Sequence, residues 1–313
     1  MSIAEHVPLS GYSTMRLGGQ ARYLTEIKDR SEIEPLLIWA REHRLSVVMI
    51  GNGTNIVWGD KGFAGLVLVN RIRKFEVLKQ DDSAYITAGA GENWDHVVGR
   101  VVALGYSGIE ELSLIPGTTG ATPVQNVGAY GREISEVLAT VEAFDRQTNQ
   151  FVTLRGSDCG FGYRTSRFKT SDKGRFFITA ISLYVGQQPS KQPFYPSLQT
   201  YFTEHSITTF SPQVIRNAVI AIRSAKLPNP AQVANNGSFF ENPIISEEQL
   251  RWFTQNFPGV IYWLRDNGSA KLSAAWLIEQ AGFKDVHDQA TGMATWPKQA
   301  LVLVNEHAHH TEL

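Results

Sequence analysis

The chain has 313 residues, of which 42% are apolar and 19% are charged, and its formal net charge is −1. This composition is typical of a globular protein with two or three domains and excludes a disordered chain. The near-neutral charge argues against a protein that binds nucleic acid or a membrane surface.

The first predicted unit, residues 1–73, reads as a small α/β layer. Strands are predicted at 21–27, 47–50 and 66–70, and a helix follows the first strand, capped by Ser31 with Glu34 three residues later. The second strand runs directly into the polar turn Gly51-Asn52-Gly53-Thr54-Asn55. Such a turn can offer backbone N–H groups to an anion. It lacks the third glycine and the amphipathic helix of a dinucleotide-binding fingerprint.

The second predicted unit, residues 74–223, is rich in strands. They are expected at 75–79, 84–88, 138–144, 151–154 and 175–185. The turn Gly89-Ala90-Gly91 precedes a predicted helix at 93–102, and a further short helix is expected after Gly131. A last helix is predicted at 212–223, because Ser211 and Pro212 match the preferences for a cap and a first turn.

Between these helices lies the run PGTTGATPVQNVGAYG, residues 116–131. Glycine lets another group approach the main chain closely, while proline stiffens the turns between the glycines. A long glycine-rich loop without a ligand would show the same pattern. Together with the two earlier glycine turns, however, this run could surround a long cofactor that contains a pyrophosphate group.

The third predicted unit, residues 224–313, begins with the proline-rich string KLPNP. Helices are predicted at 246–257 and 271–281, the second stopped by Gly282, and a strand at 300–305.

Five strings in this order carry a specific resemblance: GNGTN, GAGEN, IPGTTGATPVQNVGAYG, FGYR and NNGSFFENP. With them the chain resembles the UDP-N-acetylenolpyruvoylglucosamine reductase (MurB) family over nearly its whole length. The string FYPSL, which contains Tyr195, is similar to the type I form of that family.

The resemblance implies an α+β protein: an FAD-binding fold of the vanillyl-alcohol-oxidase/PCMH type in two small α/β subdomains, followed by a C-terminal α+β substrate domain. It implies FAD and NADPH as cofactors. The implied reaction is the reduction of UDP-N-acetylglucosamine enolpyruvate to UDP-N-acetylmuramate. This product is a peptidoglycan precursor needed for the cell wall, cell shape and cell division. It also implies a cytoplasmic monomer whose partners are small molecules.

The same resemblance carries site residues onto this chain. Arg164 matches the residue that polarises the substrate carboxylate, and Ser238 matches the proton donor. Residues expected to bind substrate are Tyr195, Lys226, Asn242 and Gln299. Residues expected to bind the cofactor are Gly51, Asn52, Gly53, Thr54, Asn55, Gly89, Ala90, Gly91, Pro116, Gly117, Gly120, Thr122, Gln125, Asn126, Gly128, Ala129, Tyr130 and Gly131.

Ordinary structural roles compete with these assignments. Ser238 could be a turn residue, Tyr195 and Asn242 loop and cap residues, Lys226 a solvated charge, and Gln299 an edge-strand side chain. The segment before Gln299 departs from the family pattern.

Family members also continue into a last strand that carries a catalytic glutamate. Glu306 and Glu312 come too early for that role, so we assign no glutamate and expect the third unit to be incomplete at its C-terminus. Two other functions stay open: a catalytically impaired protein that binds FAD or a UDP-sugar, and another FAD-linked oxidoreductase of the same fold.

The single cysteine, Cys159, excludes an intramolecular disulfide and favours a reducing compartment. We expect it to be a small buried residue and not a nucleophile. The histidines His307, His309 and His310 lack partner ligands at helical spacing, so no metal site is predicted.

Overall fold

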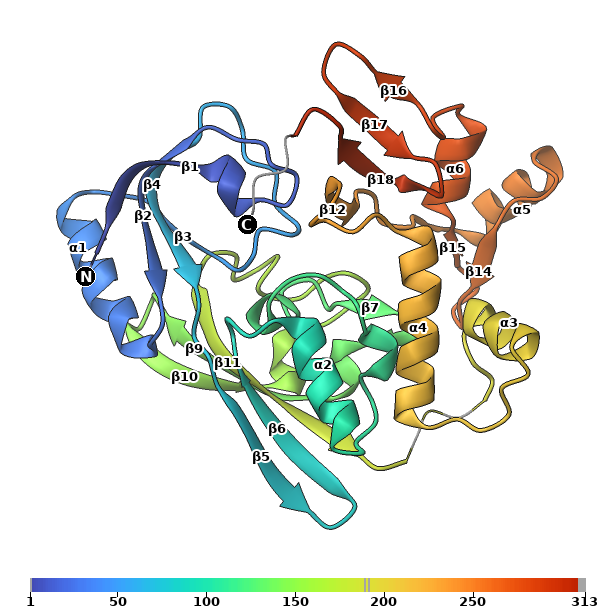
Figure 1. Ribbon diagram of the computed structural model, residues 1–313, viewed down its shortest axis with the longest axis horizontal. Helices are drawn as coiled ribbons and strands as arrows, with labels where there is room; N and C mark the ends of the chain where they lie inside the picture. Colours follow the sequence, from blue (N-terminus) through green and yellow to red (C-terminus); the bar gives the residue numbers. More distant parts are fainter. Residues whose placement is uncertain (1, 189, 191, 309–313) are drawn as a thin grey trace.

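The computed structural model describes residues 2–188, 190 and 192–308. Its N-terminal sheet has four strands, in the order β1 (Ala4–Pro8), β2 (Gln20–Ile27), β4 (Phe63–Asn70) and β3 (Val47–Ile50). The last three are parallel, and helix α1 (Ile33–Glu42) makes the crossover from β2 to β3 that a parallel pair requires. The apolar face of α1 is buried against this sheet (Figure 1). The three predicted strands of the first unit are therefore confirmed.

The central sheet is antiparallel. Its five strands follow the order β10 (Gln150–Arg155), β9 (Leu138–Asp145), β11 (Phe176–Gly186), β6 (Ser83–Gly89) and β5 (Phe75–Gln80). Helix α2 (Trp94–Ala103) packs on it through Trp94, Val97, Val98 and Val101, all at most 1% exposed. These are the residues that the 3.6-residue period placed on one helix face.

Helix α4 (Pro212–Lys226) lies beside α2, as Figure 1 shows, and Ser211 caps it by accepting a hydrogen bond from the Val214 N–H. The short α3 (Pro196–Glu204) packs on α4 through Leu198 and Phe202. The sequence reading missed α3, because its only helical signals are Pro196 at the first turn and one apolar pair at spacing four.

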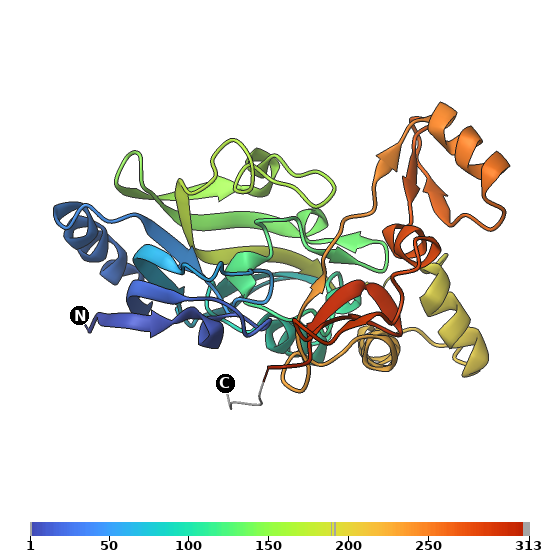
Figure 2. The same cartoon turned by 90° about the horizontal axis from the view of Figure 1, so that it is seen from above.

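Two small sheets form the C-terminal part. One runs in the order β12 (Ala234–Ser238), β18 (Gln299–Asn305), β17 (Met293–Trp296) and β16 (His287–Asp288). The other runs β13 (Ile244–Ile245), β15 (Ala270–Leu272) and β14 (Tyr262–Leu264), with helices α5 (Glu247–Asn256) and α6 (Ala274–Gln280) beside them. Figure 2 shows these elements gathered at one end of the molecule.

The remaining elements are short. A hairpin pairs β7 (Gly128–Ala129) with β8 (Arg132–Glu133). Single 3-10 turns are η1 (Leu9–Tyr12), η2 (Arg30–Glu32), η3 (Glu110–Leu112), η4 (Thr119–Ala121), η5 (Ile134–Glu136) and η6 (Gly156–Cys159). Among the described residues, no helix has both the length and the apolar character needed to cross a membrane.

Two predicted helix starts were wrong. The capping box at the first helix is made by Asp29 and Glu32, not by Ser31 and Glu34, because the chain turns immediately after β2. Residue Lys271 lies in strand β15, so the helix predicted at 271–281 begins only at Ala274. Pairing of β15 with β13 and β14 competes successfully with the helical pattern there.

The short helix expected after Gly131 is present only as a single 3-10 turn, η5. Tyr130 and Gly131 both have positive φ, 50° and 83°, and they connect β7 to β8 in a tight hairpin. Two consecutive left-handed residues match the turn that best joins antiparallel strands. The chain then enters the single turn η5.

A buried ion pair closes the end of the central sheet. Asp145, the last residue of β9, accepts hydrogen bonds from the Arg175 guanidinium at 2.9 and 2.7 Å. This contact lowers the pKa of Asp145 to about 2. Its stabilising effect is therefore present above the unfolded pKa near 4 and is lost as the pH falls towards 2.

We predict that Asp145→Asn lowers the free energy of unfolding at pH 7 by about 1–2 kcal/mol. Urea unfolding of both proteins across the range from pH 7 to pH 2 measures this difference. The difference should shrink as the pH falls from 4 to 2, because Asp145 takes up a proton first in the unfolded state and then in the folded state. A difference that is constant with pH would show that the carboxylate charge is not responsible.

Candidate functional site

The three predicted glycine turns meet in one place. A Cβ atom added to Gly51 would lie 2.1 Å from the Thr118 Oγ1, and one added to Gly120 would lie 2.4 Å from the Ala90 Cβ. Neither turn could approach so closely with a larger residue. Glycine in these turns therefore lets the backbone pack against the Thr118 and Ala90 side chains and brings segments far apart in the sequence together.

Hydrogen bonds hold the turns in register. The Gly120 N–H donates to the Ala90 carbonyl and the Thr119 N–H to the Glu92 carbonyl, both at 2.9 Å. The Asn55 side-chain amide donates to the Gln125 Oε1, also at 2.9 Å. The 116–131 loop is thus fixed to both shorter turns.

A cavity of about 280 Å³ opens where these turns meet. Its lining is Thr54, Asn55, Ile56, Trp94, Ile115, Pro116, Gly117, Thr118, Ala121, Thr122, Val124, Gln125, Val127 and Lys169. Within the described chain, the backbone N–H groups of residues 52–55, Gly117 and Thr118 donate to no protein acceptor. Apolar walls beside unpaired N–H groups fit a flat ring system joined to phosphates, which is the chemistry of FAD.

The other predicted cofactor residues lie behind this lining. Gly89 and Gly91 pack against the backbone of residues 71–74, where an added Cβ would come within 2.5 Å. Asn52 accepts a hydrogen bond from Arg71, and the Gly53 carbonyl accepts one from the Thr14 N–H. The residues that do not line the cavity are Gly51, Asn52, Gly53, Gly89, Ala90, Gly91, Gly120, Asn126, Gly128, Ala129, Tyr130 and Gly131.

Arg164 lies under the far end of the 116–131 loop. Its guanidinium donates to the Gly128 carbonyl at 2.6 Å and lies 3.4 Å from the Glu133 Oε1. Its φ of 53° is unusual for a residue other than glycine. Strained backbone of this kind is maintained when the surrounding structure holds it, often at a functional site.

Ser238 ends strand β12, beside the first unit. The Asn236 side chain accepts a hydrogen bond from the Thr14 hydroxyl and donates one to the Ile56 carbonyl, both at 2.6 Å. Ser238 itself is exposed, and its hydroxyl has no hydrogen-bond partner among the described residues. The strand is therefore held firmly while this hydroxyl stays free.

Lys169 connects the cavity with both predicted catalytic segments, although the sequence reading missed it. Its ammonium donates to the Arg164 carbonyl at 3.0 Å and to the Glu241 carboxylate at 2.8 Å, and Lys169 also lines the cavity. Its sequence signal is weak, because a single lysine near FGYR has no distinctive spacing. Lys169 therefore joins a wall of the cavity to the Arg164 backbone and to Glu241, three residues after Ser238.

Tyr195 lies near the same loop. Its ring contacts Tyr130 edge-on, with centroids 5.8 Å apart, and burial raises its pKa, with Tyr163 contributing. Tyr195 is also the N-cap residue of α3, which is the structural role that the sequence left open for it.

The other predicted substrate residues occupy the C-terminal part. The Asn242 Oδ1 accepts a hydrogen bond from the Ala274 N–H at the start of α6. Lys226 is exposed at the end of α4, where its carbonyl accepts from the Trp296 indole, and Gln299 pairs with Trp296. Lys226 and Gln299 thus share the neighbour Trp296.

A second cleft of about 330 Å³ adjoins Arg164. It is lined by Asn126, Glu133, Ser135, Phe161, Gly162, Tyr163, Ile244, Trp263, Leu264, Arg265 and Lys271. The Lys271 ammonium lies 5.2 and 5.1 Å from the ring centroids of Tyr163 and Trp263. Burial lowers the pKa of Lys271, and the nearby Arg164 charge lowers it further. Two cations this close suit an anionic ligand, and sequence reasoning missed Lys271 by placing it in a helix.

Cys159 is fully buried, and burial raises the pKa of its thiol to about 11. The expectation that Cys159 is a small buried residue is confirmed, and a protonated buried thiol is a poor nucleophile. Of the three C-terminal histidines, His309 and His310 lie outside the described residues.

Comparison with known proteins agrees with this geometry. Residues 21–154 match the family described as FAD binding domain, and residues 229–312 match the C-terminal domain of UDP-N-acetylenolpyruvoylglucosamine reductase. The chain is 42% identical to the UDP-N-acetylenolpyruvoylglucosamine reductase of Cupriavidus pinatubonensis over 302 residues, 96% of this chain and 88% of the relative.

Two further proteins are similar. The enzyme of the same name from Neisseria gonorrhoeae is 39% identical over 300 residues, 95% of this chain and 86% of the relative. The crystal structure of the reductase (MurB) from Thermus caldophilus superposes with a TM-score of 0.67 at 21% identity, covering 98% of this chain and 89% of that one. This last likeness supports the fold.

We predict that Gly51→Ala abolishes or strongly weakens FAD binding, because the added methyl group would separate the 51–55 turn from Thr118. Fluorescence titration of the flavin-free protein with FAD measures the affinity. Gly11→Ala is the control, since nothing lies within 4 Å of a Cβ at Gly11. Equal FAD affinity in the two variants would contradict this account of the turns.

Proposed function

The chain belongs to the UDP-N-acetylenolpyruvoylglucosamine reductase family, and from this premise we propose that it reduces the enolpyruvyl ether of UDP-N-acetylglucosamine to UDP-N-acetylmuramate. NADPH is the proposed reductant and FAD the resident cofactor. The product serves peptidoglycan synthesis, and through it cell-wall growth, cell shape and division. The proposed setting is the cytoplasm, with the protein acting as a monomer in three units, 1–73, 74–223 and 224–313.

The chemistry that FAD would supply is hydride transfer from NADPH to the carbon–carbon double bond of the substrate. The residues proposed to hold FAD are those of the three glycine turns. The unpaired N–H groups of the cavity-lining residues Thr54, Asn55, Gly117 and Thr118 suit its phosphates, and the Trp94, Ile115 and Val124 side chains suit its apolar parts. This combination of unpaired donors and apolar wall is the observation that carries the proposal.

Arg164 is proposed to bind the substrate carboxylate. Hydride addition leaves negative charge on the carbon next to that carboxylate, so a fixed cation lowers the energy of the transition state. A guanidinium suits this role because its planar fork binds a carboxylate through two hydrogen bonds and stays charged. Lys271 supplies a second positive charge nearby, which favours an anionic substrate in this cleft.

Ser238 is proposed to give the proton that completes the reduction. Its hydroxyl makes no hydrogen bond within the described part of the chain, as expected of a group that must face the substrate. A serine is a weak acid, so nearby positive charge must stabilise its alkoxide. Two cations are candidates: Lys226, twelve positions before Ser238 in the chain, and Lys169, whose ammonium contacts Glu241, three residues after Ser238.

Tyr195, Lys226, Asn242 and Gln299 are proposed to contact the sugar and diphosphate. Tyr195 faces Tyr130, within the cofactor loop, whereas the other three belong to the C-terminal part of the chain. A substrate that touches both groups must lie between the two parts. An impaired binding protein, or another FAD-linked oxidoreductase, is disfavoured by identities near 40% to reductases over almost the whole chain.

We predict that Ser238→Ala slows reoxidation of the flavin by the enolpyruvyl substrate by about 10²-fold to 10⁴-fold, the usual effect of losing one general acid. Reduction of the flavin by NADPH should be nearly unchanged, because no proton from Ser238 is needed in that step. Stopped-flow absorbance separates the two half-reactions.

Ser157→Ala, at an exposed serine in η6, is the matched control. Equal slowing of both half-reactions by Ser238→Ala would mean that Ser238 is structural. Absence of any substrate-dependent reoxidation in the unaltered protein would contradict the proposed reaction itself.

A further inference from the structure

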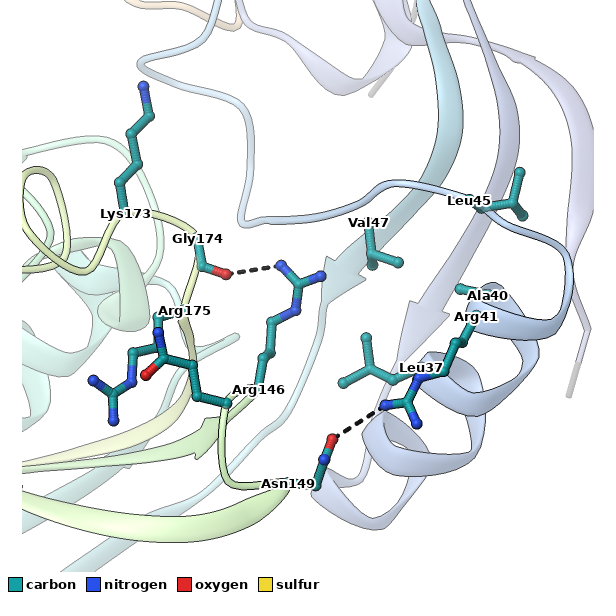
Figure 3. A pocket seen from close by; sticks show the side chains of 11 residues that line it. Leu37, Ala40, Arg41, Leu45, Val47, Arg146, Asn149, Lys173, Gly174 and Arg175 are labelled. Carbon is teal, nitrogen blue, oxygen red and sulfur yellow. Dashed lines mark hydrogen bonds between the residues drawn. The ribbon is translucent and has the colours of Figure 1, made fainter.

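A cleft of about 420 Å³ lies away from the proposed active site, between α1 and β3 on one side and the turns after β9 and before β11 on the other. Figure 3 shows it from close by. Its lining is Leu37, Ala40, Arg41, Leu45, Val47, Arg146, Gln147, Asn149, Lys173, Gly174 and Arg175. Val47 begins β3, whereas the predicted cofactor turn begins at Gly51, so the two sites lie at opposite ends of this strand.

The lining contains four cations and no carboxylate. Arg175 is already neutralised by Asp145 and Asp172, and in Figure 3 its guanidinium points away from Val47 and Leu37. The other three cations, Arg41, Arg146 and Lys173, form no ion pair within the described chain. The cleft is therefore strongly positive.

Arg146 is the most informative of these side chains. It is half-buried, it donates to the Gly174 carbonyl at 2.8 Å, and its guanidinium lies 5.0 Å from the Phe177 ring centroid. These contacts fix its position without balancing its charge, and burial alone lowers its pKa. Holding a charged group partly out of water is unfavourable unless an opposite charge accompanies it. A bound anion would supply that charge.

The opposite wall of the cleft is apolar. Leu37, Ala40, Leu45 and Val47 form it at the edge of the core that α1 makes with the N-terminal sheet. Gln147 and Asn149 add amide groups at the turn between β9 and β10, where Asn149 accepts a hydrogen bond from Arg41. A site with cations on one side and an apolar wall on the other suits a ligand that has both an anionic group and a ring.

We propose that this cleft binds a phosphorylated small molecule of nucleotide size, with its phosphate on Arg146 and its ring against Leu37 and Val47, while the exposed Lys173 adds positive charge at the rim of the cleft (Figure 3). The volume is within the range of small-molecule sites and exceeds what a lone phosphate needs. Arginine is well suited to phosphate, because its guanidinium donates two parallel hydrogen bonds. The site is separate from the FAD cavity and from the substrate cleft.

Isothermal titration of the FAD-loaded protein with AMP tests the proposal, with UDP-N-acetylglucosamine present to block the substrate cleft. Inorganic phosphate and adenosine are titrated separately as the two halves of AMP. We expect AMP to bind at least about 10-fold more tightly than either half. We expect Arg146→Gln to weaken AMP binding by roughly 10-fold to 100-fold, the usual effect of losing a hydrogen bond to a charged group.

Lys173→Gln and Lys79→Gln form a matched pair, since both lysines are exposed but Lys79 lies on β5, away from the cleft. Only the first should weaken AMP binding. Arg146→Lys keeps the charge, so it should bind AMP more tightly than Arg146→Gln and shows whether any loss reflects misfolding.

NADPH oxidation with the enolpyruvyl substrate should be unchanged in all these variants, which separates this proposal from the proposed reaction. AMP binding that survives Arg146→Gln would overturn the proposal. Equal affinities for AMP and inorganic phosphate would also overturn it. So would an equal loss of AMP affinity in Lys173→Gln and Lys79→Gln, because either result would mean that binding is non-specific charge attraction.

Discussion

The candidate site depends on one side chain, that of Asn236, which ties the C-terminal part of the chain to the first unit. It accepts from Thr14 and donates to the Ile56 carbonyl, directly after the first cofactor turn. The backbone of Asn235 and the side chain of Asn305 add hydrogen bonds to Thr14 and Met15. An asparagine can hold two segments in this way because its amide both donates and accepts. Ser238 follows two residues later, and Ile56, which Asn236 contacts, lines the cofactor cavity.

The glycine turns contribute to the same arrangement by a different mechanism. Gly51, Gly91 and Gly120 lie where a Cβ would collide with another turn or with the backbone of residues 71–72. Their main role in the protein alone is therefore close packing, and the unpaired N–H groups of neighbouring residues are left for a ligand. A rigid frame of this kind presents its donors without any loss of loop freedom on binding.

Local signals in the sequence were sufficient for much of the fold. The β3 strand and the turn after it are adjacent in the chain, and α2 has an apolar face of regular period, so both could be predicted. The start of α6 could not, because strand pairing with residues near Ile244 decides the conformation of Lys271. Similarly, Ser31 is a good cap residue in isolation, but Asp29 lies closer to the end of β2 and makes the cap.

In the candidate site, too, local sequence signals predicted some residues, and contacts between distant segments determine the others. The glycine strings and FGYR identified the cofactor loop and Arg164 because their spacing is distinctive. Lys169 and Lys271 have no such spacing, and only the folded chain brings them to Glu241 and to Tyr163. The positions of these two lysines could not be predicted, because each depends on a contact between elements that are distant in the sequence.

Stopped-flow analysis of Asn236→Ala tests most directly whether this clamp positions Ser238. The account predicts that substrate-dependent flavin reoxidation slows by about 10-fold or more, because small misplacement of a reacting group is costly, while reduction by NADPH is retained. Asn256→Ala, which removes an exposed amide at the end of α5, should change neither step. Unchanged reoxidation in Asn236→Ala would contradict the central claim.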